Sequence, residues 1–267
     1  MKNLGRLKQL LLGAVVPVAV LVFWQIAGSR PDMAGIVPTP LAVLEGWKSW
    51  VFGVSGGLGL NAYMGTWLSN VQYSSMRVMQ GFTLAALLGV PLGLIIGWSR
   101  LGSSLFDPVI QGLRPIPITA WLPFSIALFG IRDMGSIFLI FLGGFYAIVV
   151  NTTQGARDVE RNLMRAAMMM GATRAQLLRR VVFPSAMPSI FTGLRIGLGI
   201  SWTAVIVSEM VAVKSGLGYV LWDAYYVGRM DIVLADMVSI GVMGYLSDRL
   251  IVFAEQRVLR WRILQNH

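Results

Sequence analysis

Residues 165–184 read RAAMMMGATRAQLLRRVVFP, a polar and arginine-rich stretch that lies between long apolar runs. The sequence predicts two short helices joined near Gly171, because glycine permits a sharp change of chain direction. Pro184 is expected to end the second helix before the next apolar run begins. We call residues 165–184 the basic island. So basic a segment in the middle of a hydrophobic chain indicates a surface outside the membrane where another protein docks, although a solvated basic loop would carry the same charge.

The composition is typical of a polytopic membrane protein. The chain has 267 residues, of which 56% are hydrophobic and 13% are charged, whereas soluble domains carry about 25% charged residues. Its mean hydropathy is +0.69. The net charge of +10 is therefore interpreted through the placement of lysine and arginine around membrane spans, and no nucleic-acid partner is expected.

Several kinds of chemistry are excluded by residues that the chain lacks. There is no cysteine, and the only histidine is His267, so thiolate chemistry, a histidine base and a multi-histidine metal site are not expected. None of the four lysines follows a glycine, which excludes the phosphate-binding loop of nucleotide hydrolases. We expect no catalytic residue, no metal site and no bound cofactor in this chain.

Six apolar segments approach the ~20 residues that a bilayer requires. They are Leu11–Ala27, Val78–Trp98, Asp107–Gly130, Gly135–Gln154, Pro188–Ala212 and Ala235–Phe253. With the amino terminus in the cytoplasm, most of the lysines and arginines lie inside, which favours cytoplasmic termini and a cytoplasmic basic island. The basic residues outside would be Arg30, Lys48, Arg77, Arg132, Lys214 and Arg229, and those within spans would be Arg114, Arg195 and Arg249.

The second span carries a small residue at every fourth position. These residues are Gly81, Ala85, Gly89, Gly93 and Gly97. Small residues at this spacing allow helix backbones to approach closely in lipid. The pattern predicts a helix-packing face and indicates nothing about a ligand.

The segment between the first two spans is too polar and too rich in proline to cross the membrane. Residues 41–50 read LAVLEGWKSW, which predicts a short interfacial helix with Trp47 and Trp50 at the level of the lipid headgroups. Glycines at positions 53, 56, 57 and 59 predict a loop after it. No second domain is expected within residues 1–267.

The basic island resembles the EAA loop of ABC-importer permeases. That pattern is Glu-Ala-Ala, three residues, Gly, nine residues and Ile-x-Leu-Pro. The matching positions here are Ala166, Ala167, Gly171, Val181, Phe183 and Pro184. The acidic residue that names the motif is replaced by Arg165. In the family this position faces the ATPase, so Arg165 would pair with a different ATPase residue or the position would not be critical, and docking is still expected.

Other segments are similar to the nitrate, sulfonate and taurine (bicarbonate) branch of these permeases. They are VPTPLAVLEGW (37–47), LFDPVIQGLRPIPITAWLPF (105–124), FGIRDMG (129–135), NTTQGARDV (151–159) and GLRIGLGISW (193–202). The resemblance implies an all-α protein with about six spans, a type I ABC importer permease fold and both termini in the cytoplasm. Residues 28–77 would form a periplasmic loop with the interfacial helix, and residues 155–187 would form a cytoplasmic coupling loop.

The resemblance also implies a function and a set of partners. The chain would be the permease of an ATP-driven importer for a small anion, such as a sulfonate, taurine or nitrate, in the bacterial cytoplasmic membrane. Two copies would form the pore, two ATPase subunits would bind ATP and Mg²⁺ in the cytoplasm, and a periplasmic or extracytoplasmic binding protein would deliver the substrate. The residues that the resemblance assigns to ATPase coupling are Arg165, Ala166, Ala167, Gly171, Ala172, Val181 and Pro184.

Four residues are candidates for the translocation path: Arg114, Trp121, Trp202 and Glu209. Charges within a membrane are costly and usually face a cavity or a partner. Arg114 would attract an anion, or it would pair with Asp107 or extend to the cytoplasmic interface. Glu209 would gate the path or pair with Lys214, and we expect the pair.

Prolines and aromatic residues add two further expectations. Pro115, Pro117 and Pro123 would break the third span and free backbone groups beside a water-filled path. Trp222, Tyr225 and Tyr226 would form an interfacial aromatic belt or contact the binding protein, and we expect the belt.

Two other classes of membrane protein compete with the importer. An ATP-independent channel or secondary carrier would leave the basic island without a purpose, and a carrier often shows inverted repeats. A membrane-embedded enzyme would lack the histidine, cysteine and clustered carboxylates on which such catalysis depends. Co-purification of an ATPase would separate an importer subunit from a channel.

Overall fold

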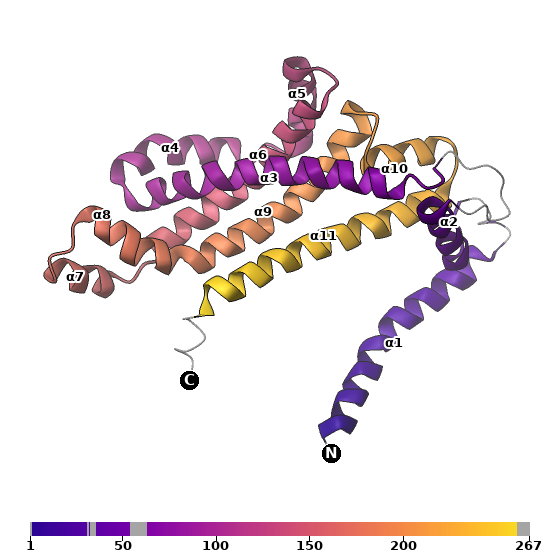
Figure 1. Ribbon diagram of the computed structural model, residues 1–267, viewed down its shortest axis with the longest axis horizontal. Helices are drawn as coiled ribbons and strands as arrows, with labels where there is room; N and C mark the ends of the chain where they lie inside the picture. The colour runs from indigo at the N-terminus through magenta and orange to yellow at the C-terminus, as the bar shows by residue number, and fades with distance from the viewer. Residues whose placement is uncertain (1, 31, 33–35, 54–62, 261–267) are drawn as a thin grey trace. The chain divides into compact units, whose positions relative to one another are not determined.

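The computed structural model describes residues 2–30, 32, 36–53 and 63–260, with side chains from residue 13 onward. Pro31 and the glycines at 56, 57 and 59 lie outside the described residues, as does His267. The described chain is helical and contains no strand (Figure 1). Its elements are α1 (Lys2–Gly28), α2 (Pro40–Phe52), α3 (Trp67–Trp98), α4 (Arg100–Leu113), η2 (Ile118–Trp121), α5 (Leu122–Phe129), α6 (Asp133–Arg157), α7 (Arg161–Met169), α8 (Arg174–Leu177), η3 (Leu178–Val182), α9 (Phe183–Ala212), α10 (Leu217–Tyr226) and α11 (Met230–Val258).

The chain divides into two compact units. Unit 1 contains residues 1–70 and 220–239, and unit 2 contains residues 71–219 and 240–267. Helices α3, α10 and α11 each contribute to both units.

Unit 2 is built on a close contact between α3 and α6. Each glycine of the α3 stripe faces a residue of α6, and both helices advance by four residues at each step, so they run parallel and in register. The facing pairs are Gly81 with Ile140, Ala85 with Gly144, Gly89 with Ile148, Gly93 with Thr152 and Gly97 with Ala156. The Thr153 hydroxyl donates a hydrogen bond of 3.1 Å to the Gly93 carbonyl across this contact. The predicted packing face is therefore confirmed.

Helix α6 also packs along α9, which runs antiparallel to it. Gly193 of α9 faces Asn151, and Gly197 faces the backbone of Gly144. The Ser201 hydroxyl donates to the Ile140 carbonyl at 3.4 Å. Small residues on both helices thus allow α6 to occupy the middle of unit 2.

The expected third span is broken. Helices α4 and α5 are bent by 93° at the residues between them, where Pro115 and Pro117 lie. Proline lacks a backbone N–H and its ring clashes with the preceding turn, so the helix cannot continue through this segment. The predicted break is confirmed at Pro115 and Pro117, whereas Pro123 lies in the first turn of α5 and does not break the helix.

Unit 1 contains a cluster of tryptophans around its core. Trp50 of α2 is fully buried and donates a 3.2 Å hydrogen bond from Nε1 to Thr66 Oγ1. The rings of Trp47 and Trp67 meet edge to face, with centroids 6.2 Å apart. The predicted helix is confirmed, and the Trp50 ring lies in the core of unit 1. The level of Trp47 and Trp50 relative to the lipid headgroups stays a prediction.

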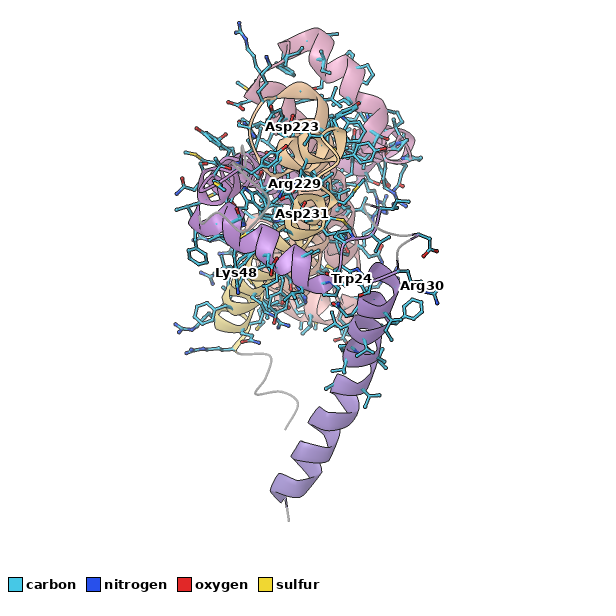
Figure 2. All side chains as sticks on the ribbon, turned by 90° about the vertical axis from the view of Figure 1, so that its right-hand side faces the viewer. Trp24, Arg30, Lys48, Asp223, Arg229 and Asp231 are labelled. Carbon is cyan, nitrogen blue, oxygen red and sulfur yellow. The ribbon has the colours of Figure 1, made fainter. Side chains whose placement is uncertain are left out.

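The connection between α10 and α11 also lies in unit 1 (Figure 2). Arg229 forms a bidentate ion pair with Asp231, with contacts of 2.9 and 2.7 Å. This hydrogen-bonded pairing with the carboxylate raises the pKa of the Arg229 guanidinium. The Tyr63 hydroxyl donates to Asp223 at 2.6 Å.

Four helices are long and apolar enough to cross a membrane, and the bent pair of α4 and α5 would make a fifth. The four are Trp67–Trp98, Asp133–Arg157, Arg174–Ala212 and Met230–Val258, and Gly13–Gly28 is a shorter apolar helix. Two helices begin well before the expected spans. The second starts at Trp67 instead of Val78, and the fifth is continuous from Arg174 instead of beginning at Pro188.

Candidate functional site

The basic island forms two short helices joined by a tight turn. Helix α7 ends at Met169, and Gly171 adopts a φ of +80°, a left-handed conformation that favours glycine. This conformation lets Ala172 N–H donate back to the Ala167 carbonyl at 3.1 Å, while Gly171 N–H donates to the Met168 carbonyl at 3.0 Å. The two bonds make a Schellman motif, in which Gly171 is the residue that the backbone conformation requires.

Helix α8 begins directly after this turn with a capping box. The Thr173 side chain accepts a hydrogen bond from Gln176 N–H at 3.3 Å, and the Gln176 side chain accepts from Thr173 N–H at 2.8 Å. These bonds satisfy backbone donors that a short helix otherwise leaves free. The local sequence therefore fixes the angle between α7 and α8.

A small apolar cluster attaches the island to the helices of unit 2. Its buried members are Ala156, Val159 and Val182, and Leu94, Trp98, Met164, Leu178 and Val181 pack against it. The opposite face remains open, since Met169 and Met170 are 83% and 82% exposed. The island thus presents an accessible surface from a fixed base.

Arginines surround this open face. Arg165 is exposed, and so are Arg161, Arg174, Arg179 and Arg180. Among the described residues none of these five forms an ion pair, which leaves their charges available to a partner. Ala166 is exposed beside Arg165, whereas Ala167 is buried.

Pro184 does not end a helix, contrary to expectation. It lies in the first turn of α9, inside a continuous helical run and directly after a π-helical turn. The five residues before α9, Leu178–Val182, form a π-helical turn, and helix continues from Arg174 to Ala212. The wider turn lets the chain pass into α9 without a break.

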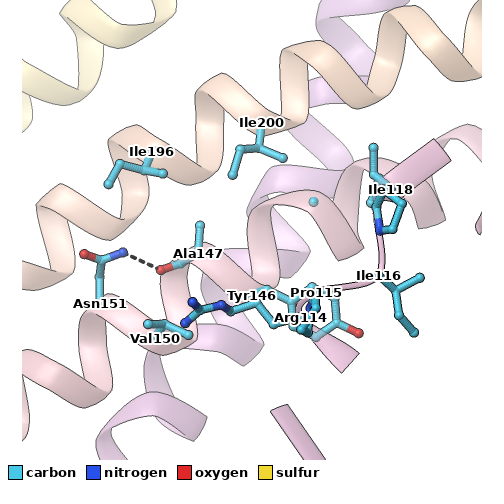
Figure 3. A pocket seen from close by; sticks show the side chains of 12 residues that line it. Arg114, Pro115, Ile116, Ile118, Tyr146, Ala147, Val150, Asn151, Ile196 and Ile200 are labelled. Carbon is cyan, nitrogen blue, oxygen red and sulfur yellow. Dashed lines mark hydrogen bonds between the residues drawn. The ribbon is translucent and has the colours of Figure 1, made fainter. Parts of the chain in front are cut away.

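A hollow of about 390 Å³ lies beside the break between α4 and α5 (Figure 3). It is lined by Arg114, Pro115, Ile116, Pro117 and Ile118 from the break, by Gly143, Tyr146, Ala147, Val150 and Asn151 of α6, and by Ile196 and Ile200 of α9. Most of these side chains are apolar, so the few polar groups would dominate the recognition of a polar solute.

Arg114 is exposed at this hollow and caps the end of α4. It forms no ion pair with any described residue, and the expected alternative, Asp107, instead pairs with Arg157 at 2.9 Å. Asn151 donates from Nδ2 to the Ala147 carbonyl at 2.8 Å (Figure 3), and no described residue donates a hydrogen bond to its side-chain oxygen. The hollow therefore presents one uncompensated cation.

The two tryptophans expected on the path lie elsewhere in unit 2. Trp202 is buried and donates from Nε1 to Ser247 Oγ at 2.9 Å, which joins α9 to α11. Trp121 lies at the start of α5, with its ring edge to face against Phe124. Neither residue lines the hollow at Arg114.

Glu209 does not pair with Lys214, and this expectation is wrong. Its carboxylate is fully buried and lies 2.7 Å from the Arg77 guanidinium of α3. Ser74 Oγ donates to both carboxylate oxygens at 2.9 and 2.8 Å, and Gly218 N–H donates at 3.0 Å. Lys214 is exposed, because it lies on the outer side of the turn that covers this carboxylate.

Sequence reasoning missed the role of Arg77. It counted Arg77 among the basic residues outside the membrane, whereas the side chain is buried in α3 and also contacts Asp133 of α6 at 2.7 Å. Arg77 further donates to the Ser215 carbonyl and hydroxyl, both at 2.8 Å. Basic residues are common directly before an apolar run. No local feature of the sequence therefore distinguished Arg77, as a buried helix residue, from a basic residue of a loop.

Comparison with known proteins places the chain in one family. Residues 89–260 match the family of binding-protein-dependent transport system inner membrane components. A putative ABC transporter permease of Methanocaldococcus jannaschii is 38% identical over 256 residues, which are 96% of this chain and 93% of that protein. The nitrate import permease NrtB of Synechocystis is 35% identical over 253 residues, 92% of this chain and 88% of its own.

A third relative and a solved structure agree with this assignment. The putative aliphatic sulfonates transport permease SsuC of Bacillus subtilis is 32% identical over 262 residues, 98% of this chain and 90% of that protein. A chain of the inward-facing MetNI methionine ABC transporter shares the fold, with a TM-score of 0.61 at 20% identity, and covers 72% of this chain and 94% of that one. The chain therefore belongs to the family of binding-protein-dependent inner-membrane transport components, as a multi-pass ABC permease subunit whose ATPase is a separate protein.

Proposed function

We propose that this permease imports a small oxyanion, and that the basic island couples it to the ATPase. One observation carries the coupling: the island exposes methionines and unpaired arginines on a turn whose backbone is fixed by Gly171. An exposed surface with a rigid backbone suits a protein partner, because little conformational entropy is lost on binding. Arg165 stands at the position where the motif has a glutamate. It would then contact an acidic group on the ATPase.

The hollow at Arg114 is the proposed passage for the substrate. It lies between the broken span and the α6–α9 pair, and its one uncompensated charge is positive. In a low-dielectric setting such a charge attracts an anion more strongly than it would in water. Trp121, Trp202 and Glu209 would act outside this hollow, by supporting helix packing.

The substrate class follows from the relatives and the charge together. Two relatives are named for nitrate and for aliphatic sulfonates, and both substrates are oxyanions. Taurine and bicarbonate, which the sequence resemblance implies, carry oxyanion groups as well. A lone arginine in an apolar hollow is compatible with each of them.

The remaining architecture is proposed from the family and the charge distribution. Two copies of the chain would form the pore around a two-fold axis, with both termini and the basic island in the cytoplasm and about six spans in the cytoplasmic membrane. Two ATPase subunits would bind ATP and Mg²⁺, while this chain binds neither. A binding protein outside would deliver the substrate.

Reconstitution in lipid vesicles tests this function. The purified permease and its ATPase would be combined with candidate binding proteins, each loaded with nitrate, an alkylsulfonate, taurine or bicarbonate. We expect one loaded binding protein to stimulate ATP hydrolysis and to drive uptake of its ligand. Stimulation by a binding protein loaded with a cation or a neutral sugar, and by none of the anions, would reject the oxyanion assignment.

A further inference from the structure

A second hollow lies at the end of unit 2 opposite the basic island. It measures about 570 Å³ and is lined by Arg77, Ile131, Arg132, Asp133, Met134, Val213, Lys214 and Ser215. Apart from Arg77 of α3, these residues lie around the start of α6 and the end of α9, whereas the island connects the other ends of α6 and α9. The hollow is therefore separate from both the island and the hollow at Arg114.

The charges around this hollow are unequal. Three cations line it against one carboxylate. Arg77 is neutralised by Asp133 and Glu209, but Arg132 and Lys214 are exposed and form no ion pair within the described part of the chain. The hollow thus carries two free positive charges beside the buried Arg77–Glu209 pair, and Asp133, whose side chain is 67% exposed, is held by Arg77.

The floor of the hollow is held in place by that cluster. Arg77 binds Ser215 through both its carbonyl and its hydroxyl, and Ser215 directly follows Lys214. Leu217 N–H donates to Ser74 Oγ at 2.8 Å on the other side of the turn. The turn that carries Lys214 is therefore fixed before any partner arrives, which lowers the entropic cost of binding.

We propose that this hollow receives an acidic side chain of the extracytoplasmic binding protein, an inference that rests on the proposed import function. Arg132 and Lys214 supply the charge complementarity. Ile131 and Met134, which are 66% and 57% exposed, supply an apolar rim. A carboxylate carried by a protein surface would cover this rim, whereas a free inorganic anion would leave it in water.

The test uses the reconstituted complex with the binding protein that stimulates wild-type ATP hydrolysis. The double variant Arg132→Glu and Lys214→Glu reverses both free charges at exposed loop positions. Lys48→Glu is the matched control, because Lys48 is an exposed cation of unit 1 with no ion pair among the described residues. We expect the double variant to need about tenfold more binding protein for half-maximal stimulation. Basal ATP hydrolysis should be unchanged, and so should the control.

Salt provides an independent measurement. Raising the ionic strength should weaken the stimulation of the wild type, and this salt dependence should be reduced in the double variant, because exposed charges are screened. Replacing the contacting acidic residue of the binding protein with lysine should restore stimulation of the double variant.

Four outcomes would overturn the docking assignment. An unchanged half-saturating concentration in the double variant would do so directly, and an equal loss in Lys48→Glu would show a general charge effect. Loss of uptake with unchanged binding of the protein would indicate a site for a small anion instead. If no binding protein stimulates the wild type, the proposed function itself fails, and the docking assignment fails with it.

Discussion

The Arg77 guanidinium of α3 lies 2.7 Å from the Glu209 carboxylate of α9, although 132 residues separate them in the chain. Both side chains are nearly inaccessible to solvent. Asp133 extends the pair to α6, so one cluster joins the three central helices of unit 2 at the same end. Removing one member of such a buried pair leaves an uncompensated charge, which costs more than the pair itself contributes.

The variant Arg77→Met should destabilise the permease by roughly 3–5 kcal/mol, because Glu209 would remain buried without its cation. The double variant Arg77→Met and Glu209→Met should recover most of this loss, since no buried charge remains. Thermal unfolding of the detergent-solubilised protein measures both effects. Arg249→Met is the control, because Arg249 is exposed, lies over the Tyr245 ring and forms no ion pair within 4 Å among the described residues. A double variant no more stable than the single one would contradict this account.

Gly171→Val should abolish ATP-driven uptake while the spans still insert. A β-branched residue is disfavoured at a φ of +80°, so the turn between α7 and α8 would change and the hydrogen bond from Ala172 to Ala167 would be lost. Gly171→Asn should retain most activity, because asparagine tolerates the left-handed conformation. Uptake and co-purification of the ATPase are the measurements. Full coupling in the valine variant would refute the role of the turn.

Gly93→Leu should separate α3 from α6. A Cβ at position 93 would lie 2.6 Å from Thr152 Cβ and 2.8 Å from the Val149 carbonyl oxygen, so the helices must move apart. Overpacking of this kind costs about 1–3 kcal/mol, occasionally more. Gly199→Leu is the matched control, since a Cβ there would meet no atom within 4 Å. Equal melting temperatures for the two variants would argue against the close helix contact.

Arg114→Gln should abolish anion uptake without loss of assembly with the ATPase. The change removes the one uncompensated charge of the hollow between α4, α6 and α9 and leaves its shape nearly intact. Arg114→Lys should keep partial uptake, because the charge remains while the planar guanidinium is lost. Radiolabelled uptake into vesicles gives the rates, and copurified ATPase reports assembly. Unchanged uptake in Arg114→Gln would exclude this residue from the path.

Local patterns predicted much of the fold because helix formation and membrane length depend on neighbouring residues. The four-residue spacing from Gly81 to Gly97 gave the packing face, and Pro115 and Pro117 gave the break in the third span. Gly171 gave the turn of the basic island. Each of these features arises from backbone sterics within a few residues, which a single sequence displays.

Pro184 shows where local reasoning failed. A proline is compatible with a position just after a helix and also with the first turn of the next one. The π-helical turn over Leu178–Val182 decided between them, because it let the chain continue into α9. Packing of Val182 into the buried cluster with Ala156 and Val159 accompanies this geometry.

The sequence by itself determined the apolar segments that form the long helices, the glycine packing face and the basic turn, since these follow from local sterics and hydrophobicity. Only the tertiary structure decided the partner of Glu209. Lys214 is five residues away and Arg77 is 132 away, yet the helix packing buries Arg77 beside the carboxylate and leaves Lys214 exposed. Charges pair according to distance and burial in space, and these are set by how α3, α6 and α9 pack.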